Sequence, residues 1–223
     1  MGDSCRILLA VLAVFAGTSV ALATPLAPGT MVIPSPEAAL PAGAYFVAPT
    51  SVPVTGINAL GEIRFTGTLT YAVYTEAATG FLDFLYQYHA ASSTDPVQHL
   101  AMTDFAGFTT DVTHLTVAPA GFAAGTLIPD SATRSPSPGS VVNFNYITPN
   151  SIGSGATTEV LAIHTNALLT APGTTNIIDG AVASVPTLGP RSAPEPATLT
   201  LFGGGLLGLL GCMWRRTMRR ASI

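Results

Sequence analysis

The side chains that could carry out chemistry are four histidines and, within residues 24–193, ten carboxylates. The histidines are His89, His99, His114 and His164, and their spacing gives no HxH pair and no HExxH motif. Zinc needs three or four ligands in one place, so His89, His99 and His114 would bind it only if their strands brought them together. We interpret the histidines as polar residues on an outward strand face and predict no metal site and no cofactor.

Three of the acidic residues, Glu62, Glu76 and Asp83, are candidates for a glycosidase pair. A glycosidase needs two carboxylates that face each other across a sugar, and nothing in the spacing selects such a pair. The chain also lacks a GxSxG elbow and a glycine-rich phosphate loop. We therefore predict no catalytic residues. A secreted hydrolase with an unrecognised site is kept as the third functional hypothesis.

The second functional hypothesis is that a surface of the outer domain binds saccharides. Asn143 and Asn145 should point outward from a strand whose Phe144 and Tyr146 point inward, because side chains alternate along a strand. Tyr74 lies on the polar face of another predicted strand. This pattern suits a carbohydrate-binding or adhesion module, and it equally suits an ordinary exposed, threonine-rich sheet.

The elements that carry these residues are predicted to be strands. Residues 63–73 alternate apolar and polar side chains, and residues 82–88 alternate again after a loop at 75–80, which indicates a β-hairpin. The apolar positions, which include Phe65, Leu69, Val73 and Phe84, are expected to point inward. Shorter candidate strands follow, separated by loops rich in Pro, Gly, Ser and Thr: 97–105, 111–118, 140–148, 158–165 and 176–185. With no crossover helices to place, the prediction is an all-β fold, an antiparallel β-sandwich that resembles a jelly roll.

The composition indicates where the segments of the chain begin and end, and it excludes some classes of binding partner. Residues 24–60 hold seven prolines, which exclude a helix or a central strand, and are predicted to be an extended lead-in with one edge strand near residues 45–48. Residues 61–185 are predicted to be the all-β outer domain, and residues 186–193 a linker. Both cysteines fall outside residues 24–193, so the outer domain has no disulfide.

Residues 24–193 contain three arginines, no lysine and ten acids, which gives a formal charge of −7. A chain with no basic patch there is not expected to bind nucleic acid.

The N-terminus has the pattern of a signal peptide. Arg6 precedes an apolar run at residues 7–15, and Ala21 and Ala23 provide the small side chains of an A-x-A cleavage site. We expect residues 1–23 to be removed after export by the Sec machinery, so that the mature chain begins at Thr24.

The C-terminal tail combines three features in a fixed order. First comes the triplet Pro194, Glu195 and Pro196. Residues 197–214 then carry no charge, and as a helix they would be ~27 Å long, close to the ~30 Å of a bilayer core. An arginine cluster follows, and it should stay cytoplasmic: Arg215, Arg216, Arg219 and Arg220. The order predicts a transmembrane helix with the outer domain on the far side of the inner membrane.

Residues 194–220 resemble the PEP-CTERM sorting signal of Gram-negative bacteria, in which a triplet, an apolar glycine-rich span and a basic end occur together. The resemblance implies that an exosortase, a membrane protease, processes the tail and that exopolysaccharide surrounds the protein. The leading hypothesis is therefore an exported, non-enzymatic protein of the cell surface or extracellular matrix, associated with a biofilm.

Overall fold

The computed structural model describes residues 23–192, and these residues form strands, turns and loops without any helix. Within this range, accordingly, there is no helix of the length and apolar character needed to cross a membrane. The expected signal peptide, apart from Ala23, and the expected C-terminal helix lie outside the described residues. Residues 23–191 form one compact unit.

Thirteen strands make up the described part of the chain. They are β1 (Thr24–Pro25), β2 (Met31–Val32), β3 (Ser35–Glu37), β4 (Gly43–Ile57), β5 (Ile63–Glu76), β6 (Leu82–Ser93), β7 (His99–Met102), β8 (Thr110–Leu115), β9 (Ser131–Arg134), β10 (Val142–Asn145), β11 (Val160–Thr165), β12 (Leu169–Asp179) and β13 (Ala181–Arg191).

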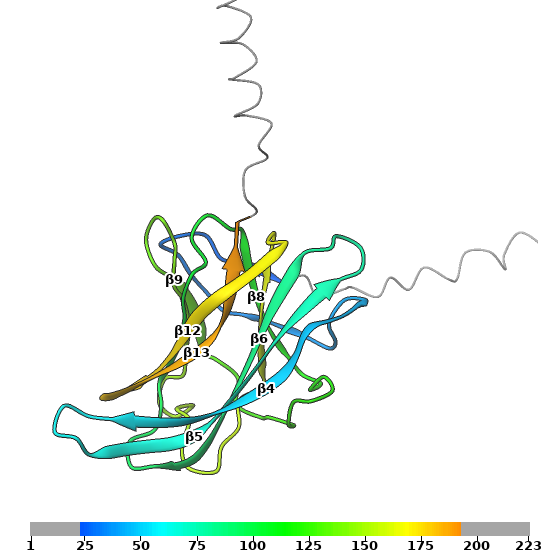
Figure 1. The fold of residues 1–223 in the computed structure, drawn as a ribbon. Coiled ribbons are helices and arrows are strands. Elements are labelled where there is room, and N and C mark those ends of the chain that lie inside the picture. Colours follow the sequence, from blue (N-terminus) through cyan, green and yellow to red (C-terminus); the bar gives the residue numbers. More distant parts are fainter. Residues whose placement is uncertain (1–22, 193–223) are drawn as a thin grey trace, which may run out of the picture. The chain divides into compact units, whose positions relative to one another are not determined.

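All of these strands belong to one sheet that nearly closes on itself. Its order is β1-β8-β11-β6-β5-β4-β13-β12-β7-β10-β9-β2, antiparallel throughout, and β3 adds a parallel pairing with β8. The long strands β4, β5 and β6 run side by side, and β12 and β13 form a second long hairpin (Figure 1). Between these groups only Val182 of β13 and Ile57 of β4 pair. The all-β, antiparallel prediction is confirmed, whereas the jelly-roll arrangement stays a prediction.

The inner face of the sheet carries the main hydrophobic core. Phe65, Leu69 and Val73 of β5 and Phe84 of β6 are fully buried there, which confirms the inward faces predicted from the alternation. A second, smaller cluster lies on the opposite face of the same strands, around Leu85. That second cluster explains why β6 has apolar residues at successive positions: both of its faces are covered.

Strands extend into both segments that flank the predicted outer domain: the edge strand expected near residues 45–48 is part of the much longer β4, and the predicted linker is also partly a strand. β4 lies in the predicted lead-in, and β13 extends through the first residues of the predicted linker, so the chain leaves the sheet only at Ser192. Both strands have one paired neighbour along most of their length, since the only residues that pair between β4 and β13 are Ile57 and Val182. A strand edge without a partner tolerates proline, which lacks an N–H to donate. Proline-rich sequence here therefore indicated edge positions rather than loops.

A buried arginine joins the two ends of the sheet. Arg134 of β9 is 5 % exposed and uses all five N–H donors of its guanidinium group. The acceptors are the carbonyls of Gly139, Leu26, Phe105 and Phe108 and the hydroxyl of Thr110, at 2.7 to 3.2 Å. Leu26 follows β1 and Thr110 begins β8, so this side chain ties β9 to the opposite end of the sheet.

Candidate functional site

The register of four strands aligns four polar residues across the outer face of the sheet. Tyr74 of β5 pairs with Asp83 of β6, Asp83 pairs with His164 of β11, and His164 pairs with Asp111 of β8. Directly paired residues point to the same face of a sheet, so these side chains form one row. The row lies on the face opposite the main core.

His164 is surrounded by carboxylates on both sides of its ring. Its Nδ1 atom lies 3.0 Å from Asp83 Oδ1 and 3.7 Å from Glu76 Oε1. Its Nε2 atom lies 3.3 Å from Glu37 Oε2. The ligand atoms of Glu76, Asp83 and His164 all lie within 4.8 Å of one another. We call these four residues, Glu37, Glu76, Asp83 and His164, the His164 cluster.

Asp83 is the most deeply buried member of the cluster, with no exposed surface. Within the described residues, neither of its carboxylate oxygens accepts a hydrogen bond, and His164 Nε2 has no hydrogen-bond partner either. The short contacts with His164 are therefore contacts between charges rather than aligned hydrogen bonds. A buried carboxylate without hydrogen bonds is costly unless a nearby positive charge compensates for it.

The protonation behaviour of the cluster follows from this burial. Burial raises the pKa of Asp83, and the neighbouring His164 lowers it only in part. Burial alone would lower the pKa of His164, but the carboxylates of Asp83 and Glu37 outweigh it and raise that pKa to about 10. Both shifts mean that the two side chains hold their protons more strongly than isolated side chains would.

Neighbouring hydroxyl groups hold the outer carboxylates in place. Thr113 Oγ1 donates a hydrogen bond of 3.2 Å to Glu37 Oε2, and Thr79 Oγ1 donates one of 2.7 Å to Glu76 Oε2. The second bond leaves Glu76 Oε1 directed at the histidine. The side chains of Glu37, Glu76 and His164 are 13 to 20 % exposed, so solvent reaches the rim of the cluster but not Asp83.

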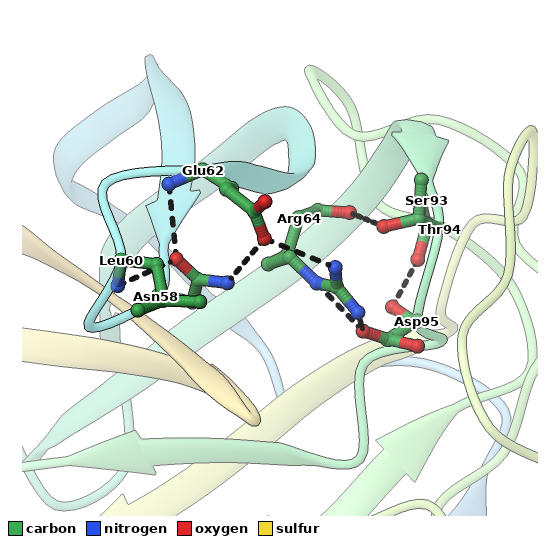
Figure 2. A network of polar contacts seen from close by, with 7 residues as sticks. All are labelled: Asn58, Leu60, Glu62, Arg64, Ser93, Thr94 and Asp95. Atoms are coloured by element: carbon green, nitrogen blue, oxygen red, sulfur yellow. Dashed lines mark hydrogen bonds and ion pairs between the residues drawn. The ribbon is translucent and has the colours of Figure 1, made fainter.

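Only some of the residues that the sequence suggested as catalytic or metal-binding groups lie close together in the structure. Of the proposed glycosidase acids, Glu76 and Asp83 do meet, whereas Glu62 lies at the tip of the β4–β5 hairpin. There it contacts Arg64, which also pairs with Asp95 (Figure 2). The other histidines have separate partners: His89 contacts Thr157, His99 contacts Asn145, and His114 contacts Glu159. The convergence of His89, His99 and His114 considered from the sequence does not occur.

A second polar surface lies on the outer face of β7, β9, β10 and β12. Asn143 and Asn145 lie on the face opposite Phe144 and Tyr146 of the main core, as predicted, although Asn145 is only 8 % exposed. Asn145 Oδ1 accepts hydrogen bonds from Asn143 Nδ2 at 2.6 Å, and it lies 2.9 Å from His99 Nδ1. A hollow of about 490 Å³ opens beside Asn143 and His99. We call this surface the amide face.

The remaining site predictions concern the two ends of the chain. Ala23 precedes β1, whereas Ala21 lies outside the described residues. The triplet of Pro194, Glu195 and Pro196 lies outside them as well, and so does the arginine cluster at residues 215–220.

Comparison with known proteins identifies the C-terminal tail. Residues 192–216 match the family model of the PEP-CTERM protein-sorting motif, which confirms the resemblance seen in the sequence. The motif implies export, transit through the membrane and processing by an exosortase. No curated protein and no solved structure matched the chain.

Proposed function

We propose that this chain is a non-enzymatic protein of the cell surface or extracellular matrix, delivered by an exosortase and associated with exopolysaccharide in a biofilm. The sorting motif at residues 192–216 is the single observation that carries the proposal. The mature outer domain has a formal charge of −7 and no lysine, which suits a soluble matrix component rather than a nucleic-acid-binding one.

The geometry of the outer domain supports a structural role. Of the proposed glycosidase acids, Glu76 and Asp83 lie close together, but the Asp83 side chain has no exposed surface. A glycosidase needs both carboxylates to reach the sugar, and Asp83 cannot. Much of the described chain lies in strands paired over long stretches, as in β4–β5 and β12–β13. Such a sheet provides a durable exported scaffold.

This proposal predicts where the protein accumulates. In a biofilm-forming host that carries an exosortase, we expect an antibody against the outer domain to detect most of the protein in the extracted exopolymer fraction. A periplasmic protein should remain with the cells as the control for lysis. Retention of the outer domain in the inner membrane or periplasm of the same cells would contradict the proposal.

The amide face favours a second candidate function, a carbohydrate-binding or adhesion module. Saccharide hydroxyls are recognised by side chains that both donate and accept hydrogen bonds, and amides do both. Asn143 is half-buried beside the hollow, and its Oδ1 atom has no hydrogen-bond partner among the described residues. This oxygen is itself buried, so a rotation of the Asn143 side chain toward the hollow would be needed to present it to a donor group of a ligand.

This second candidate predicts binding on a glycan array that depends on Asn143. Replacing Asn143→Ala should weaken binding about tenfold, since a hydrogen bond to a buried acceptor contributes about 1–1.5 kcal/mol. The matched control is Asn166→Ala, an exposed amide whose oxygen accepts a hydrogen bond from the Thr109 N–H, away from the amide face. Absence of any glycan signal, or equal loss in both variants, would remove this candidate.

A further inference from the structure

The His164 cluster carries more negative charge than its surroundings neutralise. It contains three carboxylates and one imidazole, so its formal charge is −2 even when His164 is protonated. The chain has no lysine, and none of the arginines between residues 23 and 192 forms an ion pair with these acids. A divalent metal ion bound at Nδ1 would displace the proton of His164 to solvent, so the three carboxylates would carry −3 and the ion would reduce the charge of the site to −1.

The spacing of the three inner ligand atoms suits a metal ion. A transition metal with bonds of about 2.0–2.2 Å to nitrogen and oxygen holds its ligand atoms roughly 3.0–3.5 Å apart. The distances from His164 Nδ1 to Asp83 Oδ1 and Glu76 Oε1 are 3.0 and 3.7 Å. Small movements of the Glu76 side chain would bring all three atoms onto one ion.

The fully buried Asp83 is an independent indication of a ligand. Its two oxygens face the cluster without a hydrogen bond from any described residue. Carboxylates in protein interiors are normally hydrogen-bonded, paired with charges or bound to metals. Among residues 23–192, only the His164 ring lies within ion-pairing distance of Asp83, and its contact is with Oδ1 rather than Oδ2.

The orientation of His164 also matches a metal ligand. Its Nε2 atom faces Glu37, whose Oε2 atom is held by Thr113, so its Nδ1 atom faces Asp83 and Glu76. Histidines that bind metals commonly direct their second nitrogen at a carboxylate, which fixes the ring and increases its basicity. In this arrangement Glu37 positions the ligand and does not itself touch the ion.

We propose that Glu76, Asp83 and His164 bind one divalent transition-metal ion, such as Zn²⁺ or Mn²⁺, with Glu37 as the residue that orients His164. The imidazole ligand favours Zn²⁺, and the two carboxylates also suit Mn²⁺, whereas Ca²⁺ and Mg²⁺ prefer oxygen ligands throughout. The ion would link the β5–β6 hairpin to β11 and, through Glu37, to β3. It would stabilise an outer domain whose sequence offers no disulfide.

The test is metal binding by the full chain, purified in detergent with a histidine-free tag and stripped with EDTA. Titration calorimetry with ZnCl₂ or MnCl₂ should give one equivalent bound. Saturating metal should raise the melting temperature by about 5–10 °C, as expected for a ligand that binds only the folded state. CaCl₂ and MgCl₂ should give a much smaller rise.

Metal binding by variants of the proposed ligands, compared with control variants, tests where the ion binds. Asp83→Asn and Glu76→Gln should each weaken binding at least about tenfold, and Glu37→Gln by about 10- to 100-fold, as outer carboxylates commonly do. The controls are His114→Gln and Glu159→Gln, which alter a comparable histidine–carboxylate contact of 2.6 Å elsewhere. Glu76 is partly exposed, so its variant should fold even if a change at Asp83 does not.

Three results would overturn the proposal. The first is no binding of Zn²⁺ or Mn²⁺ by the folded chain. The second is unchanged binding in Glu76→Gln and Asp83→Asn, and the third is equal losses in the His114→Gln control. None of these results affects the sorting function, which rests on residues 192–216.

Discussion

Replacing Pro194, Glu195 and Pro196 by three alanines should abolish processing of the tail and leave the protein in the inner membrane. Proline fixes its own φ and keeps the triplet extended, and a glutamate cannot enter the bilayer cheaply. The triplet should therefore stand just outside the membrane, where a membrane protease can bind it. In a host that carries an exosortase, we expect the triple-alanine protein to keep its full length on a gel and to fractionate with membranes.

Deleting residues 215–220 provides the matched comparison. Those arginines set the orientation and retention of the apolar span, so their loss should disturb membrane retention rather than recognition by the protease. A tag inserted before Ser192 follows the outer domain in both variants. If the triple-alanine protein is shortened and released like the parent, the triplet has no role and the tail is an anchor alone.

Replacing Arg134 by methionine should lower the stability of the outer domain by about 4 kcal/mol, because five hydrogen bonds to buried acceptors are lost together. Burial lowers the pKa of this guanidinium, but an arginine stays charged, so the wild-type contacts are all charge-assisted. For a domain of this size the melting temperature should fall by about 10 °C. Thermal unfolding followed by circular dichroism measures the change.

Arg64→Met is the control for the loss of a positive charge. Arg64 pairs with Asp95 and Glu62 at the solvent-exposed tip of the β4–β5 hairpin (Figure 2). Exposed ion pairs contribute little to stability, so this variant should melt close to the parent. Equal melting temperatures for the Arg134 and Arg64 variants would show that Arg134 does not join the ends of the sheet.

Local patterns in the sequence predicted much of the fold. Alternation along β5 identified Phe65, Leu69 and Val73 as inward residues, and the same rule placed Asn143 and Asn145 outside. β9 was missed because its four residues lie in a stretch rich in Ser and Pro. The β12–β13 hairpin was taken for one strand, although Gly180, with a φ of 57°, allows the turn between them.

The His164 cluster could not be predicted from the sequence. Asp83 and His164 are distant along the chain and meet because β6 pairs with β11 in one particular register. A shift of one residue would place His164 on the inner face, and neighbouring residues do not specify that register. One signal was available: Asp83 is an acid in a strand whose two neighbours, Leu82 and Phe84, are both apolar. An acidic side chain between two apolar neighbours in a strand is either exposed to solvent or paired with a buried partner.

The most direct test of the sorting function is the intact mass of the outer domain recovered from outside the cell, compared between an exosortase-carrying host and its exosortase deletion. We predict that the protein from the intact host begins at Thr24 and lacks residues 215–220. In the deletion strain the protein should keep those residues and stay in the inner membrane. An extracellular protein of the same mass from both strains, with residues 215–220 still attached, would contradict sorting by the PEP-CTERM motif.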